Sequence, residues 1–235
     1  MQKWYAKLLA KTTVAEETLE FSFEKPDQFT FTAGQYILLQ LPELQHADPK
    51  GPVRTFTISS APHEKTINIT TRHTGSGFKT TLAELSMNSA VEIMGPQGDF
   101  VYKKSGKEAV FIAGGIGITP FFSITKRFYN EQFHPLTLIY SNRTRASTAY
   151  HDFFLSLQKQ EPGFKYIPTF VEASQEWHGE KRLVDDSFIR DYITEINEKE
   201  VYLCGPPGMV EALKNLFKKL AIPEEQVYFE SFFGY

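Results

Sequence analysis

The sequence contains a single cysteine, Cys204, among its 235 residues. One thiol cannot form a disulfide within the chain. It also cannot supply the four cysteine ligands of an iron–sulfur cluster. The composition therefore excludes a disulfide framework and a cluster held by four cysteines of this chain.

Long hydrophobic runs are also missing from the sequence. No apolar run approaches the roughly 20 residues that cross a bilayer. The polar start of the chain lacks the charged and apolar regions of a secretory signal. We therefore expect a soluble, cytoplasmic protein with no transmembrane segment.

Positive charge is not in excess, since 25 Lys and Arg face 28 Asp and Glu. A net charge of −3 and the lack of a basic stripe with interleaved aromatics argue against nucleic-acid binding. His134, His151 and His178 are scattered without metal-ligand spacing, so no metal site is expected. No G-x-S-x-G motif is present, which argues against a serine hydrolase.

What the sequence does contain is a globular composition with two different halves. Residues 1–103 are short, β-rich segments separated by Pro, Gly, Asn and Asp, typical of a barrel or sandwich. A short helix is predicted at 78–85, after Gly75 and Gly77. The strands of this half are predicted at 4–9, 18–23, 35–41, 54–59, 66–72 and 90–94.

After a polar linker at 103–107, strands and helices alternate over residues 107–235, which predicts a doubly wound parallel sheet. Ligands bind such sheets at the carboxyl ends of the strands, here 114–119, 141–143, 171–174 and 204–207. The strands are predicted at 108–113, 136–140, 165–170, 200–203 and 226–230, and the helices at 120–130, 147–160, 185–192 and 207–220.

A buried strand at 109–113 leads into a glycine turn with Gly114, Gly115 and Gly117. Glycine lets the backbone turn tightly and approach a ligand. Thr119 is predicted to be the N-cap of the next helix and Pro120 its first residue, a start that favours phosphate. An ordinary strand-to-helix turn explains the same residues, and Pro120 stands where the dinucleotide motif has its third glycine.

Arg54 and Phe56 share one face of a predicted strand, and Thr57 lies on the other. An exposed arginine on a barrel strand is the simpler interpretation. Together with the helix start after Gly75, however, the guanidinium predicts a pyrophosphate site. Phe56 would then be a wall for a flat ring, with the Thr57 hydroxyl at its edge.

Three motifs, in this order, resemble those of the ferredoxin–NADP reductase superfamily. They are Arg54-x-Phe56-Thr57, Gly114-Gly115-x-Gly117-x-Thr119-Pro120 and Cys204-Gly205-Pro206. The resemblance implies an N-terminal antiparallel Greek-key β-barrel that binds flavin. An α/β domain with a parallel sheet that binds NAD(P) would follow it.

For the flavin, the resemblance implies that Arg54 binds the phosphates, Phe56 packs on the isoalloxazine and Thr57 lies near its N5. The resemblance implies FAD as the flavin. Because many relatives have serine or threonine where Lys79 stands, FMN stays an alternative. The segment that would bind the FAD pyrophosphate is Ser76, Phe78, Lys79 and Thr80.

For the nicotinamide nucleotide, the resemblance implies a pyrophosphate site at Gly114, Gly115, Gly117, Thr119 and Pro120. Cys204 would lie beside the nicotinamide, followed by Gly205 and Pro206, with a positioning role. A small buried hydrophobe is the alternative for this thiol. Ser141 and Arg143 end a strand without an acidic residue, which favours NADPH over NADH, although Arg143 is equally compatible with a surface loop.

At the C-terminus, Glu230-Ser231-Phe232 resembles the Glu-x-Tyr ending of plant-type relatives, extended by three residues. Phe232 or Tyr235 would stack on the flavin, or the tail simply docks on the barrel. Glu230 would relay a proton to the flavin N5. Thr57, Cys204 and Glu230 are therefore the candidate catalytic residues.

The resemblance implies an FAD-dependent NAD(P)H oxidoreductase that passes electrons to a separate acceptor. The acceptor would be ferredoxin, flavodoxin, an oxygenase component or a small molecule. A free-flavin reductase of the same fold and a non-catalytic flavin- or nucleotide-binding regulatory module remain alternatives. Lys3, Lys7 and Lys11 form either a basic patch for an acidic carrier or an ordinary solvated surface.

Overall fold

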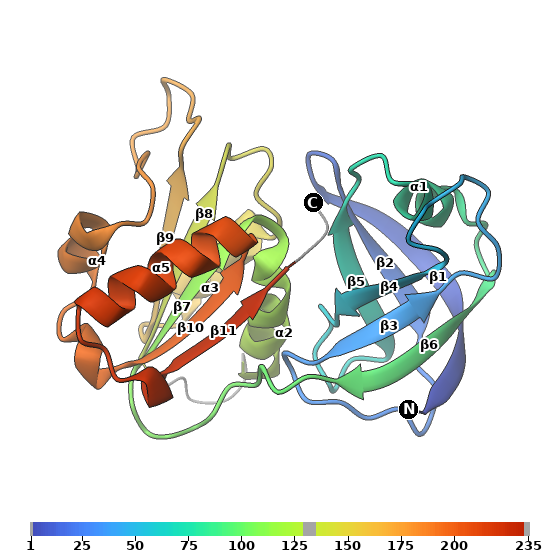
Figure 1. Ribbon diagram of the computed structural model, residues 1–235, viewed down its shortest axis with the longest axis horizontal. Helices are drawn as coiled ribbons and strands as arrows, with labels where there is room; N and C mark the ends of the chain where they lie inside the picture. Colours follow the sequence, from blue (N-terminus) through green and yellow to red (C-terminus); the bar gives the residue numbers. More distant parts are fainter. Residues whose placement is uncertain (1, 129–134, 233–235) are drawn as a thin grey trace. The chain divides into compact units, whose positions relative to one another are not determined.

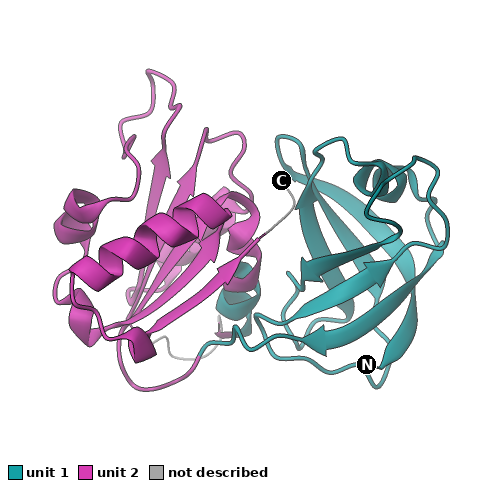
Figure 2. Ribbon diagram, in the orientation of Figure 1, with its two compact units in different colours: residues 1–102, 122–127 teal, residues 103–121, 128–235 magenta. Residues whose placement is uncertain are grey.

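The computed structural model describes residues 2–128 and 135–232. The chain forms two compact units, residues 1–102 with 122–127, and residues 103–121 with 128–235 (Figure 2). Each unit has its own sheet and its own hydrophobic core, and each is described by itself below.

The first unit is a six-stranded antiparallel sheet with the order β4-β3-β6-β1-β2-β5. Its two ends meet where Ile58, just after β4, forms an antiparallel bridge with Ile69 of β5. The expected antiparallel barrel is thereby confirmed. Its strands are β1 (Lys3–Ala15), β2 (Thr18–Glu24), β3 (Tyr36–Gln40), β4 (Val53–Thr57), β5 (Thr66–Arg72) and β6 (Ala90–Gln97).

Side chains along β2 alternate between the two faces of the strand, so Phe21 and Phe23 both point into the barrel core and are buried. Helix α1 (Gly77–Glu84) adds Phe78 and Leu82 to the same core. Each such side chain stabilises the fold by roughly 1.5–3 kcal/mol. This packing anchors α1 to the barrel and fixes where its N-terminus lies.

The second unit is a five-stranded parallel sheet with the order β11-β10-β7-β8-β9, as expected for a doubly wound domain (Figure 1). Its strands are β7 (Ala109–Gly114), β8 (Leu136–Asn142), β9 (Phe164–Phe170), β10 (Glu200–Gly205) and β11 (Val227–Ser231). The helices are α2 (Ile118–Phe128), α3 (His151–Gln160), α4 (Asp186–Tyr192) and α5 (Pro207–Lys219). Short 3₁₀ turns occur at η1 (Gly115–Gly117), η2 (Ile196–Glu198) and η3 (Glu224–Gln226).

Successive side chains of β7 point to opposite faces of this sheet. Val110 and Ile112 join the core that α4 and α5 cover. Phe111 points the other way and stacks on Phe121 of α2, with ring centroids 4.6 Å apart. A strand covered on both faces is apolar throughout, which is why its sequence reads as one continuous apolar run.

Several boundaries differ from those that the sequence predicts; β1, for example, extends to Ala15, whereas its predicted end is residue 9. Helix α2 begins at Ile118, two residues earlier than expected, because η1 leads directly into it. Helix α3 begins four residues late, since Ser147 is held in a turn by Thr144, whose side chain accepts its N–H at 3.2 Å. Strand β6 continues to Gln97, three residues past its predicted end, because Gln97 still pairs with Tyr36 of β3.

Residues 122–127 of α2 belong to the first unit. The buried Ser123 donates its hydroxyl to the Ser60 carbonyl oxygen at 2.6 Å, and Lys126 pairs with Glu64 at 2.7 Å. Among the helices of the described residues, none is long and apolar enough to cross a membrane.

Candidate functional site

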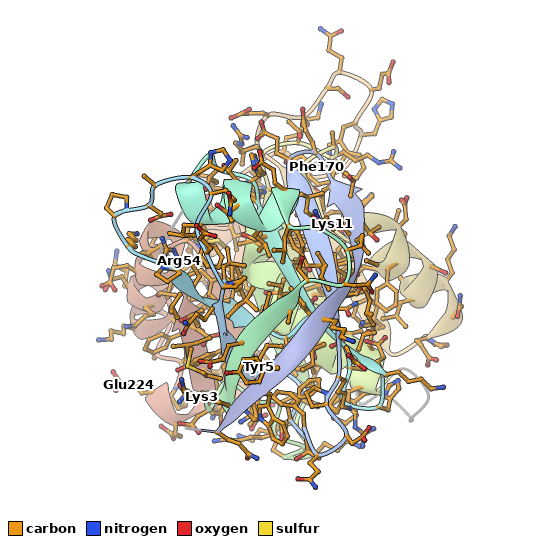
Figure 3. The ribbon with its side chains drawn as sticks, turned by 90° about the vertical axis from the view of Figure 1, so that its right-hand side faces the viewer. Lys3, Tyr5, Lys11, Arg54, Phe170 and Glu224 are labelled. Carbon is orange, nitrogen blue, oxygen red and sulfur yellow. The ribbon has the colours of Figure 1, made fainter. Side chains whose placement is uncertain are left out.

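Arg54 on β4 is fixed by the loop that connects β3 to β4. Its Nη1 donates to the carbonyl oxygens of Lys50 at 3.1 Å, Gly51 at 2.9 Å and Val53 at 2.7 Å. Its Nη2 donates to Asp48 Oδ1 at 2.5 Å. The Arg54 side chain retains 18% exposure and that of Asp48 only 4%, so a rigid cation stands at the barrel surface (Figure 3).

The N-terminus of α1 lies beside this arginine. The guanidinium of Arg54 lies over the Phe78 ring, 5.1 Å from its centroid. Ser76 is the N-cap, with its Oγ accepting the Lys79 N–H at 3.3 Å. Thr80 Oγ1 donates to the Ser76 carbonyl oxygen at 3.1 Å. The structure therefore brings together Arg54 and the residues 76–80 that the sequence predicts to bind a pyrophosphate.

The electrostatics of this corner fit an anionic ligand. Burial, together with the positive charges of Arg54, Lys50 and Arg72, lowers the pKa of Lys79 to about 8. An anion among these cations relieves their mutual repulsion. The donor set, with a helix N-terminus beside it, matches the diphosphate of a dinucleotide such as FAD.

Phe56 and Thr57 follow Arg54 on β4 and are largely buried. Phe56 retains 8% exposure, belongs to the barrel core and packs on Phe78 with centroids 5.9 Å apart. Thr57 retains 6% exposure. Phe78 itself is fully buried and its N–H donates to Asp48 at 2.9 Å, so it contributes to the predicted site by supporting Arg54. The roles of Phe56 and Thr57 toward a flat ring stay predictions.

In the second unit, the glycine turn after β7 is helical from Gly115 onward. The expected N-cap role of Thr119 is therefore wrong, because Thr119 lies inside the first turn of α2. Its hydroxyl donates back to the Ile116 carbonyl oxygen at 3.1 Å. Pro120 is the third residue of α2 rather than the first, a position where proline is tolerated within the first turn.

Two of these glycines are required by close packing. A Cβ atom on Gly117 would lie 2.4 Å from the Cys204 carbonyl oxygen, and one on Gly114 would lie 2.3 Å from Met209 Sδ. A Cβ atom on Gly205 would in turn lie 3.2 Å from Gly114 Cα. The glycine turn and the turn from Cys204 through Gly205 to Pro206 are thus in direct contact.

Cys204 and Glu230 are paired neighbours on β10 and β11. Burial raises the pKa of the Cys204 thiol well above its usual range, and the Glu230 carboxylate raises it further. Burial also raises the pKa of Glu230 to about 7. In the described part of the chain, the buried Oε2 of Glu230 has no hydrogen-bond partner. A buried carboxyl oxygen without such a partner can accept a hydrogen bond from a ligand or carry a proton.

The residues after Glu230 follow the same edge. The Phe232 N–H donates to the Gly205 carbonyl oxygen at 3.0 Å, which keeps Phe232 beside the Cys204–Pro206 turn. Tyr235, the other candidate for stacking on a flavin, lies outside the described residues.

The ends of β8 and β9 carry the remaining predicted rim residues. Ser141 pairs with Gly114 in the β7–β8 ladder. Arg143 is exposed, and the structure shows it no ion pair in the described ranges. Arg182, in contrast, is bound to Glu180 at 3.0 Å and to Asp191 at 2.6 Å. Arg143 is therefore the better placed of these two cations for a phosphate at this rim.

The lysines of β1 are largely occupied within the first unit. Lys3 pairs with Glu92 at 2.9 Å, and Lys11 Nζ donates to the Ala83 carbonyl oxygen at 2.5 Å. Between them Tyr5 is 75% exposed (Figure 3). A basic docking patch on this strand therefore has less free charge than three lysines suggest.

Sequence reasoning missed two residues that hold the site. Asp48 binds both Arg54 and the Phe78 N–H, the latter at 2.9 Å. Tyr140 donates its hydroxyl to the Gly115 carbonyl oxygen at 3.0 Å. Tyr140 is indistinguishable from a core residue by sequence, whereas the turn Asp48-Pro49-Lys50-Gly51 just before Arg54 offers a usable signal.

Two family models match consecutive parts of the chain. Residues 5–102 match the oxidoreductase FAD-binding domain, and residues 111–215 match the oxidoreductase NAD-binding domain. The two matches follow the two halves that differ in sequence pattern.

Individual relatives agree with these matches. The reductase component of phenol 2-monooxygenase from a Pseudomonas species is 28% identical over 92% of this chain and 61% of its own length. The reductase component of propane 2-monooxygenase from Mycolicibacterium smegmatis is 29% identical over 88% of this chain and 61% of its own length. The chain thus spans less than two thirds of these relatives.

Among solved structures, a ferredoxin NADP+ reductase from Neisseria gonorrhoeae with bound FAD and NADP matches the fold. The TM-score is 0.84, with 18% identity over 98% of this chain and 99% of that chain. At this identity the similarity establishes the fold.

Proposed function

Because the chain belongs to the ferredoxin–NADP reductase superfamily, with an FAD-binding domain followed by an NAD-binding domain, we propose that it is an NAD(P)H-dependent flavoprotein reductase. It takes hydride from NADPH or NADH onto FAD and delivers electrons to a separate acceptor. The observation that carries this proposal is the cationic corner of Arg54 and Lys79 at the N-terminus of α1.

In this proposal the first unit binds FAD. Arg54, with Ser76, Phe78, Lys79 and Thr80 of the α1 N-terminus, holds the diphosphate, and Lys79 supplies charge as an ammonium at neutral pH. Phe56 and Thr57 contact the ring system. FAD supplies the chemistry of accepting hydride and releasing electrons singly.

The second unit binds the nicotinamide nucleotide at the carboxyl ends of its strands. The turn that contains Gly114, Gly115 and Gly117, followed by Thr119 and Pro120, holds the diphosphate. Ser141 and Arg143 recognise the adenosine ribose, and Arg143 favours the 2′-phosphate of NADPH. Gly205 and Pro206 shape the nicotinamide end.

Three side chains support the transfer step in this proposal. Thr57 is a hydroxyl at the edge of the flavin ring. Cys204 is a buried, protonated thiol that orients the nicotinamide without nucleophilic attack. Glu230, with a pKa of about 7, exchanges a proton at neutral pH. Phe232 lies beside the Cys204–Pro206 turn, to which its N–H binds.

The acceptor is a separate molecule in this proposal. Two relatives are named as reductase components of monooxygenases, which makes an oxygenase component a candidate beside ferredoxin and flavodoxin. Cys204, a thiol in the structure, is compatible with the reducing cytoplasm as the site of action.

Purification tests the proposal. The protein is expected to retain FAD, with absorption near ~450 nm, and to reduce ferricyanide with NADPH or NADH. A preparation that binds no flavin after reconstitution contradicts the proposal. Turnover that requires added free flavin supports a free-flavin reductase instead, and bound flavin without turnover supports a regulatory module.

A further inference from the structure

We propose that Asp48 is a positioning residue that orients the Arg54 guanidinium toward the diphosphate of FAD. This inference rests on the proposed function of the first unit. No motif of the sequence assigns Asp48 a role, and its contacts in the structure carry the argument.

The Asp48 carboxylate is held from three directions. Oδ2 accepts the Phe78 N–H at 2.9 Å, and Oδ1 accepts the Lys50 N–H at 3.0 Å as well as an Nη2 proton of Arg54 at 2.5 Å. Its side chain is only 4% exposed. These donors lower the pKa of Asp48, so it stays ionised and keeps its hold on Arg54 at neutral pH.

The loop that carries Asp48 is itself fixed to α1. Thr81 Oγ1 accepts the N–H groups of Gln45 at 3.1 Å and His46 at 3.2 Å. A Cβ atom on Gly77 would lie 2.3 Å from the Ala47 carbonyl oxygen, so loop and helix are in backbone contact. Asp48 is therefore presented by a rigid support.

The contacts of Arg54 leave part of its guanidinium available. Nη1 faces three carbonyl oxygens, and Nη2 gives one proton to Asp48. Among the described residues, the Nε–H and the second Nη2 proton have no partner. These neighbouring donors form the fork that binds two oxygens of one phosphate.

The same contacts hold the Arg54 side chain in one orientation. With Asp48 and the three carbonyls in place, the Arg54 guanidinium lies over the Phe78 ring. Without Asp48, Nη2 loses its anchor and the fork is no longer fixed. A fixed fork binds more tightly because less side-chain freedom is lost on binding.

If Asp48 instead competed with the phosphate of FAD, removing its charge would change the affinity for FAD in the opposite direction. Asp48 is an anion at the N-terminus of α1, where it occupies the Phe78 N–H that a phosphate would accept. If FAD had to displace it, removing its charge would tighten FAD binding. The two interpretations are separated by one double-mutant cycle.

The experiment measures the dissociation constant of FAD by quenching of flavin fluorescence in four proteins: wild type, Asp48→Asn, Arg54→Ala and the double variant. We expect Asp48→Asn to weaken FAD about tenfold, because a charge-assisted anchor is lost. In the Arg54→Ala background the same change should cause no further loss, because Asp48 acts through Arg54. Thermal unfolding verifies that each variant is folded.

Glu84→Gln is the matched control. Glu84 binds His46 of the same loop at 2.7 Å and is exposed, without contact to Arg54. Its FAD affinity should equal that of the wild type. Three results would contradict the positioning role. Asp48→Asn could leave the affinity for FAD unchanged, or it could increase that affinity. It could also lower the affinity by the same factor in the wild-type and Arg54→Ala backgrounds. A wild-type protein that binds no FAD instead overturns the proposed function and this role with it.

Discussion

At the scale of single residues, Glu230 has the most informative environment. Its pKa of about 7 results from burial, and its Oε2 lacks a hydrogen-bond partner among the described residues. A carboxyl group that is half ionised near neutral pH is a poor structural element but a good proton donor and acceptor. The fold keeps it beside Cys204 by strand pairing.

This environment predicts a pH-dependent cost in stability. In the unfolded chain the Glu230 carboxyl titrates near 4.5, and in the folded protein near 7. Below pH 4.5 it is protonated in both states and costs nothing. As the pH rises from 4.5 to 7 the unfolded state loses the proton first, so the folded state is progressively disfavoured.

We expect Glu230→Gln to raise the free energy of unfolding at pH 8 by about 1–2 kcal/mol, less than the full shift implies because the group is partly solvated. At pH 4 the gain should vanish. Urea unfolding at both pH values measures this. Replacing the exposed Glu225 with Gln is the control, and an equal gain at both pH values would contradict the ionisation argument.

Arg143 is the residue proposed to discriminate between NADPH and NADH. Arg143→Ala should weaken NADPH about tenfold or more while changing NADH little, because only NADPH carries the 2′-phosphate that a guanidinium binds. Steady-state KM values for both donors test this. Arg190→Ala, at an exposed position on α4, is the control. Equal losses for both donors would remove Arg143 from the 2′-phosphate role.

At the scale of elements, the glycine turn and β10 are in close backbone contact. Gly117 lies against the backbone of Cys204 and Gly205, and a Cβ atom added to it would be 2.4 Å from the Cys204 carbonyl oxygen. Backbone cannot move aside as a flexible side chain can. The glycine is therefore required for helix–strand packing whether or not a nucleotide binds.

Gly117→Ala should lower the free energy of unfolding by about 1–3 kcal/mol, the usual cost of overpacking. Gly208→Ala in the first turn of α5 should be neutral or stabilising by up to about 1 kcal/mol, because nothing lies within 4 Å of the position that its Cβ atom would take. Chemical unfolding of both variants measures the difference. Similar values for the two would show that the close packing is not rigid.

The elements themselves were largely predictable from sequence because their determinants are local. Alternation defined β2, and an unbroken apolar run defined β7. The start of α2 was not predictable, since the preceding η1 turn depends on packing against β10. Thr119 has N-cap chemistry, but the backbone is already helical before it.

The site was predictable only where a motif marks it. Arg54 and the glycine turn have recognisable spacing, whereas Asp48 acts through a fold contact across the β3–β4 loop. The turn Asp48-Pro49-Lys50-Gly51 marks the loop in the sequence, but where the loop docks on α1 is specified only by the fold. The available Arg143 and the internally paired Arg182 are likewise distinguished only by the structure.

At the scale of the whole molecule, the chain combines an FAD-binding domain with an NAD-binding domain. Nicotinamide delivers electrons as a hydride pair, and a flavin is the group that can receive a pair and release single electrons. The relatives named as reductase components are longer than this chain.

The central claim is that this chain transfers hydride from NAD(P)H to FAD. Anaerobic stopped-flow mixing of the FAD-loaded protein with NADPH, and separately with NADH, tests it directly by following absorbance near ~450 nm. We expect a rapid loss of this absorbance that saturates with nucleotide concentration, faster with NADPH than with NADH. If the FAD-loaded protein keeps its absorbance with both nucleotides, the account is contradicted.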